Sequence, residues 1–173
     1  MSSSIPFPPP AYASANVKGA LLVECRRRQQ EKADAARRAM DDAQASANDH
    51  AGAMEDKFES FRENCQIQRD LFARQLDDAL TGLAVLRRLD EAAARPGAPA
   101  AAPVIAGLGG LVETDRGGRF FLAISLGPIP DPAGGSPWLA VSTSSPIGQA
   151  LVGRRVDDTL LFRGETHRLT AIG

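Results

Sequence analysis

The sequence predicts an α+β fold: an N-terminal antiparallel α-helical hairpin followed by a small C-terminal antiparallel β-sheet domain with one short helix. Two long segments repeat apolar or small residues in steps of three and four, a stretch rich in Pro, Gly and Ala follows, and apolar residues then alternate with polar ones. We expect a mobile tail at residues 1–15, the coiled-coil hairpin at 16–93, a linker at 94–104 and the sheet domain at 105–173.

Two amphipathic segments make up the predicted hairpin. The stripe of the first, from about Asn16, is Leu22, Cys25, Gln29, Ala33, Ala36, Met40, Ala43 and Ala47. The stripe of the second, which ends near Ala94, is Phe58, Phe61, Cys65, Gln68, Phe72, Leu76, Ala79, Leu83 and Leu86. Residues 48–54, NDHAGAM, contain the only glycine between Gly19 and Gly82, so we expect the chain to reverse there. Helices of about 30 residues give an arm of about 45 Å.

Alternating apolar residues predict the strands of the C-terminal domain. The segments are GLVETD and RFFLAIS around a turn at residues 116–118, then WLAVST, then TLLFR and THRLTAI around Gly164 and Glu165. The connection GPIPDPAGGSP, residues 127–137, is expected to be a long loop because it is rich in turn-forming residues.

The segment SSPIGQALVG, residues 144–153, predicts the short helix. Ser145 is a candidate N-cap, Pro146 fits the first helical position with its fixed φ, and Gly153 fits the left-handed position after the helix. A capped helix of this kind commonly links two strands, so on local evidence its role is structural.

Composition excludes several classes of protein. The 173 residues have a net charge of -1, which gives no simple argument for wrapping around nucleic acid. No apolar run approaches the ~20 residues of a membrane span, and the start MSSSIPFPPP lacks the regions of a secretory signal, so we expect a cytoplasmic protein without membrane contact. Two cysteines and two histidines are too few for a disulfide framework or a Cys/His zinc site, and the cysteines are expected to be reduced.

The C-terminal part of the sequence resembles a known family. Residues 144–172, SSPIGQALVGRRVDDTLLFRGETHRLTAI, with weaker support from GRFFLAIS and WLAVSTSSP, resemble the C-terminal domain of Gre-type transcription elongation and cleavage factors. The hairpin resembles divergent, shorter Gre-like proteins in AMDDAQASAN and EDKFES. The resemblance implies an FKBP-like C-terminal domain and a monomeric accessory factor, not itself an enzyme. Its implied partner is bacterial RNA polymerase, whose secondary channel the hairpin enters toward the 3′ end of the nascent RNA.

The resemblance also implies chemistry at the end of the hairpin. Asp49, Glu55 and Asp56 are the candidate catalytic residues, and Asp49 with Glu55 are candidate ligands for a Mg²⁺ ion shared with the polymerase active site and not bound stably by the factor alone. There the polymerase would cleave a backtracked transcript. The alternative is structural, because Asp49 fits a helix cap and the other two fit a helix N-terminus.

The candidate acidic end departs from the family pattern. NDHAGAMEDKF does not reproduce the Asp-x-x-Glu-Asn arrangement of cleavage-competent factors, and His50 beside Asp49 is expected to be a solvated surface histidine. A non-cleaving regulator that occupies the secondary channel is therefore the alternative function. At Asp157 the family more often has glycine, and a turn with positive φ there would suit aspartate less well.

Two further groups are candidate partner contacts. Ser145, Pro146 and Ile147 are expected to face the polymerase, with Leu151 in the core. Arg26, Arg27 and Arg28 fit contacts with RNA phosphates or acidic loops, and equally a solvated helix face.

A peptidyl-prolyl isomerase is a third hypothesis, suggested only by the FKBP-like architecture. Such catalysis needs a pocket lined by aromatic side chains, and the domain offers Phe120, Phe121, Trp138 and Phe162, several of which must build its core.

Overall fold

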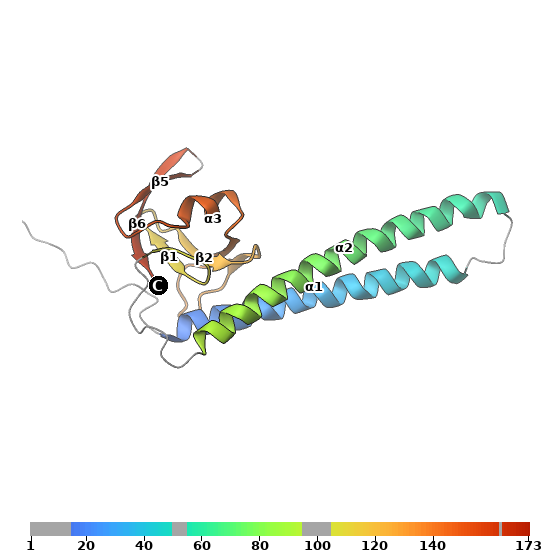
Figure 1. The fold of residues 1–173 in the computed structure, drawn as a ribbon, viewed down its shortest axis with the longest axis horizontal. Coiled ribbons are helices and arrows are strands. Elements are labelled where there is room, and N and C mark those ends of the chain that lie inside the picture. Colours follow the sequence, from blue (N-terminus) through green and yellow to red (C-terminus); the bar gives the residue numbers. More distant parts are fainter. Residues whose placement is uncertain (1–14, 50–54, 95–104, 163) are drawn as a thin grey trace, which may run out of the picture. The chain divides into compact units, whose positions relative to one another are not determined.

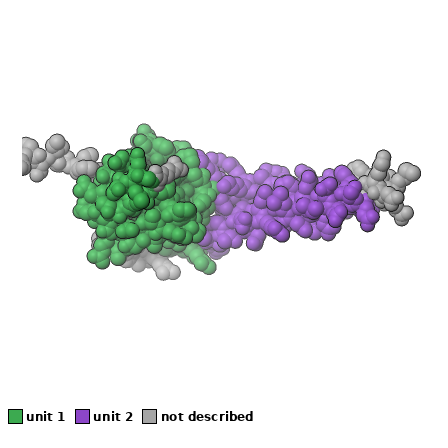
Figure 2. Space-filling view, turned by 90° about the horizontal axis from the view of Figure 1, so that it is seen from above, with its two compact units in different colours: residues 1–25, 88–173 green, residues 26–87 purple. Residues whose placement is uncertain are grey.

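The computed structural model describes residues 15–49, 55–94, 105–162 and 164–173. The chain forms two compact units, residues 26–87 and residues 1–25 with 88–173 (Figure 2). The predicted α+β architecture of a helical hairpin followed by a sheet with one short helix is confirmed.

Two long helices build the hairpin, α1 (Ala15–Asp49) and α2 (Glu55–Ala93) (Figure 1). Gln29 of α1 donates from Nε2 to the carbonyl oxygen of Ala79 at 3.0 Å, and Arg69 of α2 donates from Nη1 to Oε1 of Gln44 at 3.1 Å. The earlier residue of α1 thus pairs with the later residue of α2, so the helices run antiparallel. Within the described ranges, no helix is both long enough and apolar enough to cross a membrane.

The packing of the two helices combines small side chains with one buried amide. The buried positions among the described residues of unit 26–87 are Gln29, Ala33, Ala36, Ala43, Cys65, Ala79, Gly82 and Leu86. Gln29 reaches the backbone of α2 because Gly82 has no side chain: a Cβ there would lie 2.5 Å from the Gln29 Nε2 atom. The hydrogen bond to Ala79 satisfies the buried Gln29 amide inside the interface and gives the pairing of the helices a specific register.

Every residue of the predicted stripe of α1 is buried or half-buried. The predicted stripe of α2 is wrong at two residues, and the side chain of its first residue, Phe58, lies outside the described residues. Phe61 is 38% exposed and Gln68 is exposed. Arg69, the neighbour of Gln68, is the residue that contacts α1, through Gln44. Both cysteines are free and buried, as the sequence predicts.

Six strands form one sheet in unit 1–25 and 88–173, in the order β3-β4-β2-β1-β6-β5. Their bounds are β1 Leu111–Thr114, β2 Arg119–Ala123, β3 Gly127–Ile129, β4 Trp138–Ser142, β5 Thr159–Phe162 and β6 Glu165–Ile172. The hairpins around residues 116–118 and around Gly164 are as predicted, although Glu165 already belongs to β6.

The expectation of a purely antiparallel sheet is wrong at one pairing. Strands β2 and β4 are parallel, with Phe121 opposite Ala140. The cause is β3, which forms in the segment expected to be a loop and pairs antiparallel with β4 at the edge of the sheet. The chain reverses once between β2 and β3 and again between β3 and β4, so β4 runs in the same direction as β2.

The helix α3 (Pro146–Leu151) packs on one face of the sheet. The buried cluster there is Ala106, Val112, Phe120, Leu122, Val141, Ile147, Leu151, Leu160, Leu169 and Ile172. Residues that alternate with these along the strands, Leu111, Phe121 and Trp138, are buried as well. Phe120, Phe121 and Trp138 are thus used for packing, which leaves Phe162 as the partly buried member of the four aromatics considered for an isomerase pocket.

Candidate functional site

The acidic residues expected at the end of the hairpin lie on both helices. Asp49 is the last residue of α1, and Glu55 and Asp56 are the first two residues of α2. Because the helices are antiparallel, these positions lie at the same end of the hairpin. Asp49 ends α1 and stands six residues before the first residue of α2.

The reversal itself, residues 50–54 with His50, lies outside the described residues, and so do the side chains of Asp49, Glu55 and Asp56. In the described parts of the chain, no three His, Cys, Asp or Glu side chains come together as a metal site. The acidic residues offer the hard oxygen donors that Mg²⁺ prefers, so their chemical class fits the ion.

The three consecutive arginines near the start of unit 26–87 do not form one patch. Consecutive residues of an α-helix point about 100° apart, so Arg26, Arg27 and Arg28 fan around α1. Arg26 and Arg27 are exposed and Arg28 is half-buried. Arg27 forms an exposed ion pair with Glu31 one turn later.

The predicted caps of α3 are confirmed. The Ser145 hydroxyl accepts a hydrogen bond from the Gly148 N–H at 3.2 Å and donates to the Ser142 carbonyl oxygen at 2.7 Å. Pro146 is the first helical residue, and Gly153 has φ +83°. A Cβ at Gly148 would overlap the Ser142 carbonyl oxygen, so glycine permits α3 to approach the end of β4.

The three expected partner contacts differ in what they expose. Ile147 is 6% exposed and belongs to the sheet core, so its side chain offers almost no surface, and the expectation that it faces a partner needs correction. Ser145 is half-buried and bonded within its own turn. Pro146 is exposed. The predicted core role of Leu151 is confirmed.

Asp157 occupies the strained backbone conformation anticipated for that position. Its φ is +70°, and among the described residues it is the single non-glycine residue with a positive φ. Its N–H donates to the Leu169 carbonyl oxygen at 2.9 Å, which ties the turn to β6. The turn is stabilised further by Asp158, whose Oδ2 accepts from the Arg155 N–H at 2.8 Å.

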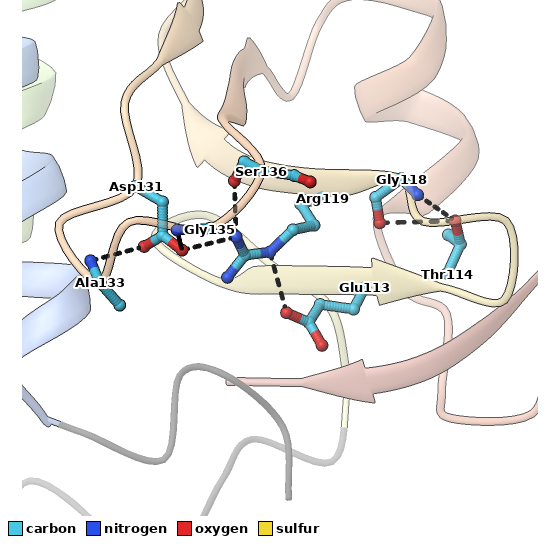
Figure 3. A network of polar contacts seen from close by, with 8 residues as sticks. All are labelled: Glu113, Thr114, Gly118, Arg119, Asp131, Ala133, Gly135 and Ser136. Carbon is cyan, nitrogen blue, oxygen red and sulfur yellow. Dashed lines mark hydrogen bonds and ion pairs between the residues drawn. The ribbon is translucent and has the colours of Figure 1, made fainter. Parts of the chain in front are cut away.

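A buried ionic network in the sheet domain was missed by the sequence analysis (Figure 3). Arg119 at the start of β2 donates from Nη1 to Asp131 Oδ2 at 2.8 Å and from Nε to Glu113 Oε1 at 3.1 Å. Its guanidinium carbon lies 4.1 Å from the centre of the Trp138 ring. The Arg119 and Asp131 side chains are 10% and 2% exposed.

Asp131 joins this network to the loop before β4. Its Oδ1 accepts from the Ala133 N–H and its Oδ2 from the Gly135 N–H, both at 3.2 Å. Burial favours the neutral carboxyl, but Arg119 and the two backbone donors outweigh it and hold the pKa of Asp131 below its usual value. The network therefore fixes the turn-rich segment and is structural.

The chain is structurally similar to two solved structures. One is GreA factor homolog 1 (Gfh1) of Thermus thermophilus, with 19% identity, 87% of this chain and 95% of that chain covered, and a TM-score of 0.31. The other is the transcription factor Gfh1, with 21% identity, 86% and 93% covered, and a TM-score of 0.33. No protein-family model and no curated protein matches the sequence. The similarity concerns the fold alone.

Proposed function

We propose that this chain is a Gre-like accessory factor of bacterial RNA polymerase. It binds at the secondary channel, extends its helical hairpin toward the active site and promotes cleavage of backtracked transcripts. The polymerase performs the hydrolysis, so the factor is not itself an enzyme. The proposal rests on the antiparallel hairpin with acidic residues from both helices at one end, together with the Gre-like residues 144–172.

The length of the hairpin supports delivery of its end to a distant site. From Arg26 to Asp49, α1 rises about 35 Å at about 1.5 Å per residue. Its interface is made largely of alanines on α1, with the Gln29 amide bonded to α2. Such an interface gives a thin rod, which suits entry into a channel.

The acidic end would assist a reaction that the polymerase catalyses. A Mg²⁺ ion held between the polymerase and Asp49 with Glu55 would supply Lewis acidity and an activated water for phosphodiester hydrolysis. The contribution of this chain is to bring carboxylates from two helices to the reacting end of the RNA. Asp56, next to Glu55 on α2, adds negative charge at the same end.

The test is transcript cleavage in stalled, backtracked elongation complexes with labelled RNA. We expect the protein to accelerate cleavage, and the variant Asp49→Asn/Glu55→Gln/Asp56→Asn to lose the acceleration while still co-purifying with core polymerase. The control is Asp41→Asn/Asp42→Asn, which removes exposed acidic side chains elsewhere on α1. If the wild-type protein did not co-purify with core polymerase, the whole proposal would be contradicted.

A non-cleaving regulator of the secondary channel is the second candidate. It is favoured by NDHAGAMEDKF, which lacks the Asp-x-x-Glu-Asn arrangement. In that case the wild-type protein binds core polymerase and slows nucleotide addition but produces no cleavage products. The same assay, run with nucleotides added after stalling, separates the two functions.

A further inference from the structure

The buried interface between the two helices of the hairpin is uneven along its length. We define the proximal part as residues 26–39 of α1 with 71–87 of α2, and the distal part, nearer the reversal, as residues 40–48 with 59–70. The buried residues of the proximal part are Gln29, Ala33, Ala36, Ala79, Gly82 and Leu86. Among the described side chains of the distal part, only those of Ala43 and Cys65 are buried. The apolar packing that joins the helices is therefore weaker toward the reversal.

The distal interface also encloses unfilled space. A groove of about 400 Å³ lies between the helices there, and its lining residues are Ala43, Gln44, Ala47, Asn48, Arg62, Cys65, Gln66 and Arg69. The small side chains of Ala43, Ala47 and Cys65 do not bridge the gap between the helices. Atoms that border such a space lose the dispersion contacts that a close-packed interface would give them. The groove thus lowers the stability of the distal interface further.

Polar contacts across the helices differ between the two parts in the same sense. In the distal part, Arg69 donates to Gln44 at the surface, where competition with water keeps the net contribution of a hydrogen bond small. In the proximal part, the bond from Gln29 to the Ala79 carbonyl oxygen is buried. Separation of the helices at Gln29 would leave a buried amide without a partner, which is costly. The proximal part is therefore the harder of the two to open.

We propose that the distal part opens and closes as a conformational unit of its own while the proximal part stays paired. Segments with few buried apolar contacts open at a lower free energy than the whole domain needs to unfold. The closed form holds the ends of both helices together, and opening separates them and exposes the Cys65 thiol. If the hairpin delivers its acidic end to the polymerase, opening takes that end apart. This consequence rests on the proposed function, whereas the opening itself does not.

The two native cysteines report on opening without any substitution. Cys65 is 6% exposed and lies in the distal part, whereas Cys25 is 0% exposed and lies in the other compact unit. The full chain is labelled with iodoacetamide at several urea concentrations below the unfolding transition, and mass spectrometry gives the rate at each cysteine. We expect Cys65 to react at least about tenfold faster than Cys25 and with a smaller dependence on urea, because local opening exposes less surface than global unfolding. Equal rates with equal urea dependence would indicate one global opening and overturn the proposal.

Hydrogen exchange separates local opening from direct attack of the reagent on Cys65 in the closed groove. We expect the backbone amides of residues 40–48 and 59–70 to exchange with similar opening free energies, well below those of residues 29–36 and 76–86. Uniform protection along both helices would overturn the proposal even if Cys65 reacted fast. A gradual loss of protection toward the reversal would overturn it as well, because that pattern is fraying from the end and not the opening of a unit.

A pair of matched substitutions tests whether the unfilled space causes the opening. Ala47→Leu adds apolar atoms inside the groove with little change in helix propensity, so labelling of Cys65 and exchange of the distal amides should slow by about tenfold. The control Ala45→Leu places the same side chain on the exposed face of α1 and is expected to stay within about twofold of the wild type. Equal effects of the two substitutions, or faster labelling in Ala47→Leu, would contradict the role of the groove. Since none of these measurements involves the polymerase, their failure is distinct from failure of the cleavage assay.

Discussion

The most quantitative test of the fold concerns the buried carboxylate of Asp131. Its side chain is 2% exposed, bonds Arg119 at 2.8 Å and accepts two backbone N–H groups of the loop before β4. In Asp131→Ala the Arg119 charge keeps only Glu113 as an ionic partner, and the two backbone donors lose their acceptor.

The expected loss of unfolding free energy is about 3–5 kcal/mol, because removal of one partner leaves a buried charge uncompensated. The matched control is Glu165→Ala. That residue pairs with Arg116 at 3.4 Å with both side chains more than half exposed, so its loss is expected to cost no more than about 1 kcal/mol.

Denaturant unfolding followed by tryptophan fluorescence measures both variants. Trp138 is the only tryptophan in the sequence and stacks on Arg119, so its emission reports directly on this part of the sheet domain. If Asp131→Ala were no more destabilising than Glu165→Ala, the assignment of the network as a structural clamp would be refuted.

The same carboxylate predicts a pH dependence. Asp131 has a lowered pKa in the folded protein, so its contribution is complete above the ordinary aspartate pKa of about 4. The contribution is lost as the pH falls through the lowered folded value, because the unfolded chain then binds the proton more readily. The stability of Asp131→Asn should fall less over this acidic range than that of the wild type.

The remaining predictions concern three backbone positions, each measured by denaturant unfolding with circular dichroism and fluorescence. Asp157→Gly should stabilise the protein by about 1 kcal/mol, since glycine adopts the φ of +70° without steric cost, and a destabilisation would contradict strain at that turn. Gly148→Ala should destabilise by more than about 2 kcal/mol, since the added methyl meets the Ser142 carbonyl oxygen, and a neutral result would exclude that close approach. Gly82→Ala should cost about 1 kcal/mol in the wild type but become stabilising in a Gln29→Ala background, where helix propensity alone remains; an unchanged sign would refute the contact.

Local patterns in the sequence predicted the helical parts of the fold well. The steps of three and four fixed both long helices, and the Ser-Pro and Gly signals fixed both ends of α3. The expected strain at Asp157 also depends only on local backbone geometry. These features could be predicted from the sequence because their causes lie within a few neighbouring residues.

Features that depend on distant residues were not predicted. The three-residue strand β3 exists only by pairing with β4, and the parallel pairing of β2 with β4 follows from it. The bond between Arg119 and Asp131 crosses from a strand to a loop, and neither residue has a local pattern that identifies its partner. An Asp-Pro-Ala-Gly-Gly segment after a strand signals a turn, but the ionic partner depends on the sheet order.

The positions of the candidate residues in the fold could be predicted from the sequence to different extents. The placement of acidic residues on both helices at one end followed from the hairpin, whereas the burial of Ile147 depended on how α3 packs against the sheet. The stripe pattern gives the faces of the helices but not their register.

The central claim is that the hairpin brings its acidic end to the active site of RNA polymerase. It is tested most directly by a photo-crosslinking residue at Glu59, which is exposed in α2 one turn after Glu55, in a backtracked elongation complex. We predict crosslinks from this position to the 3′ end of the RNA, and none from the same probe at the exposed Arg37, which is farther from the reversal. Crosslinks from Glu59 only to the outer surface of the polymerase, or to no part of the complex, would contradict the claim.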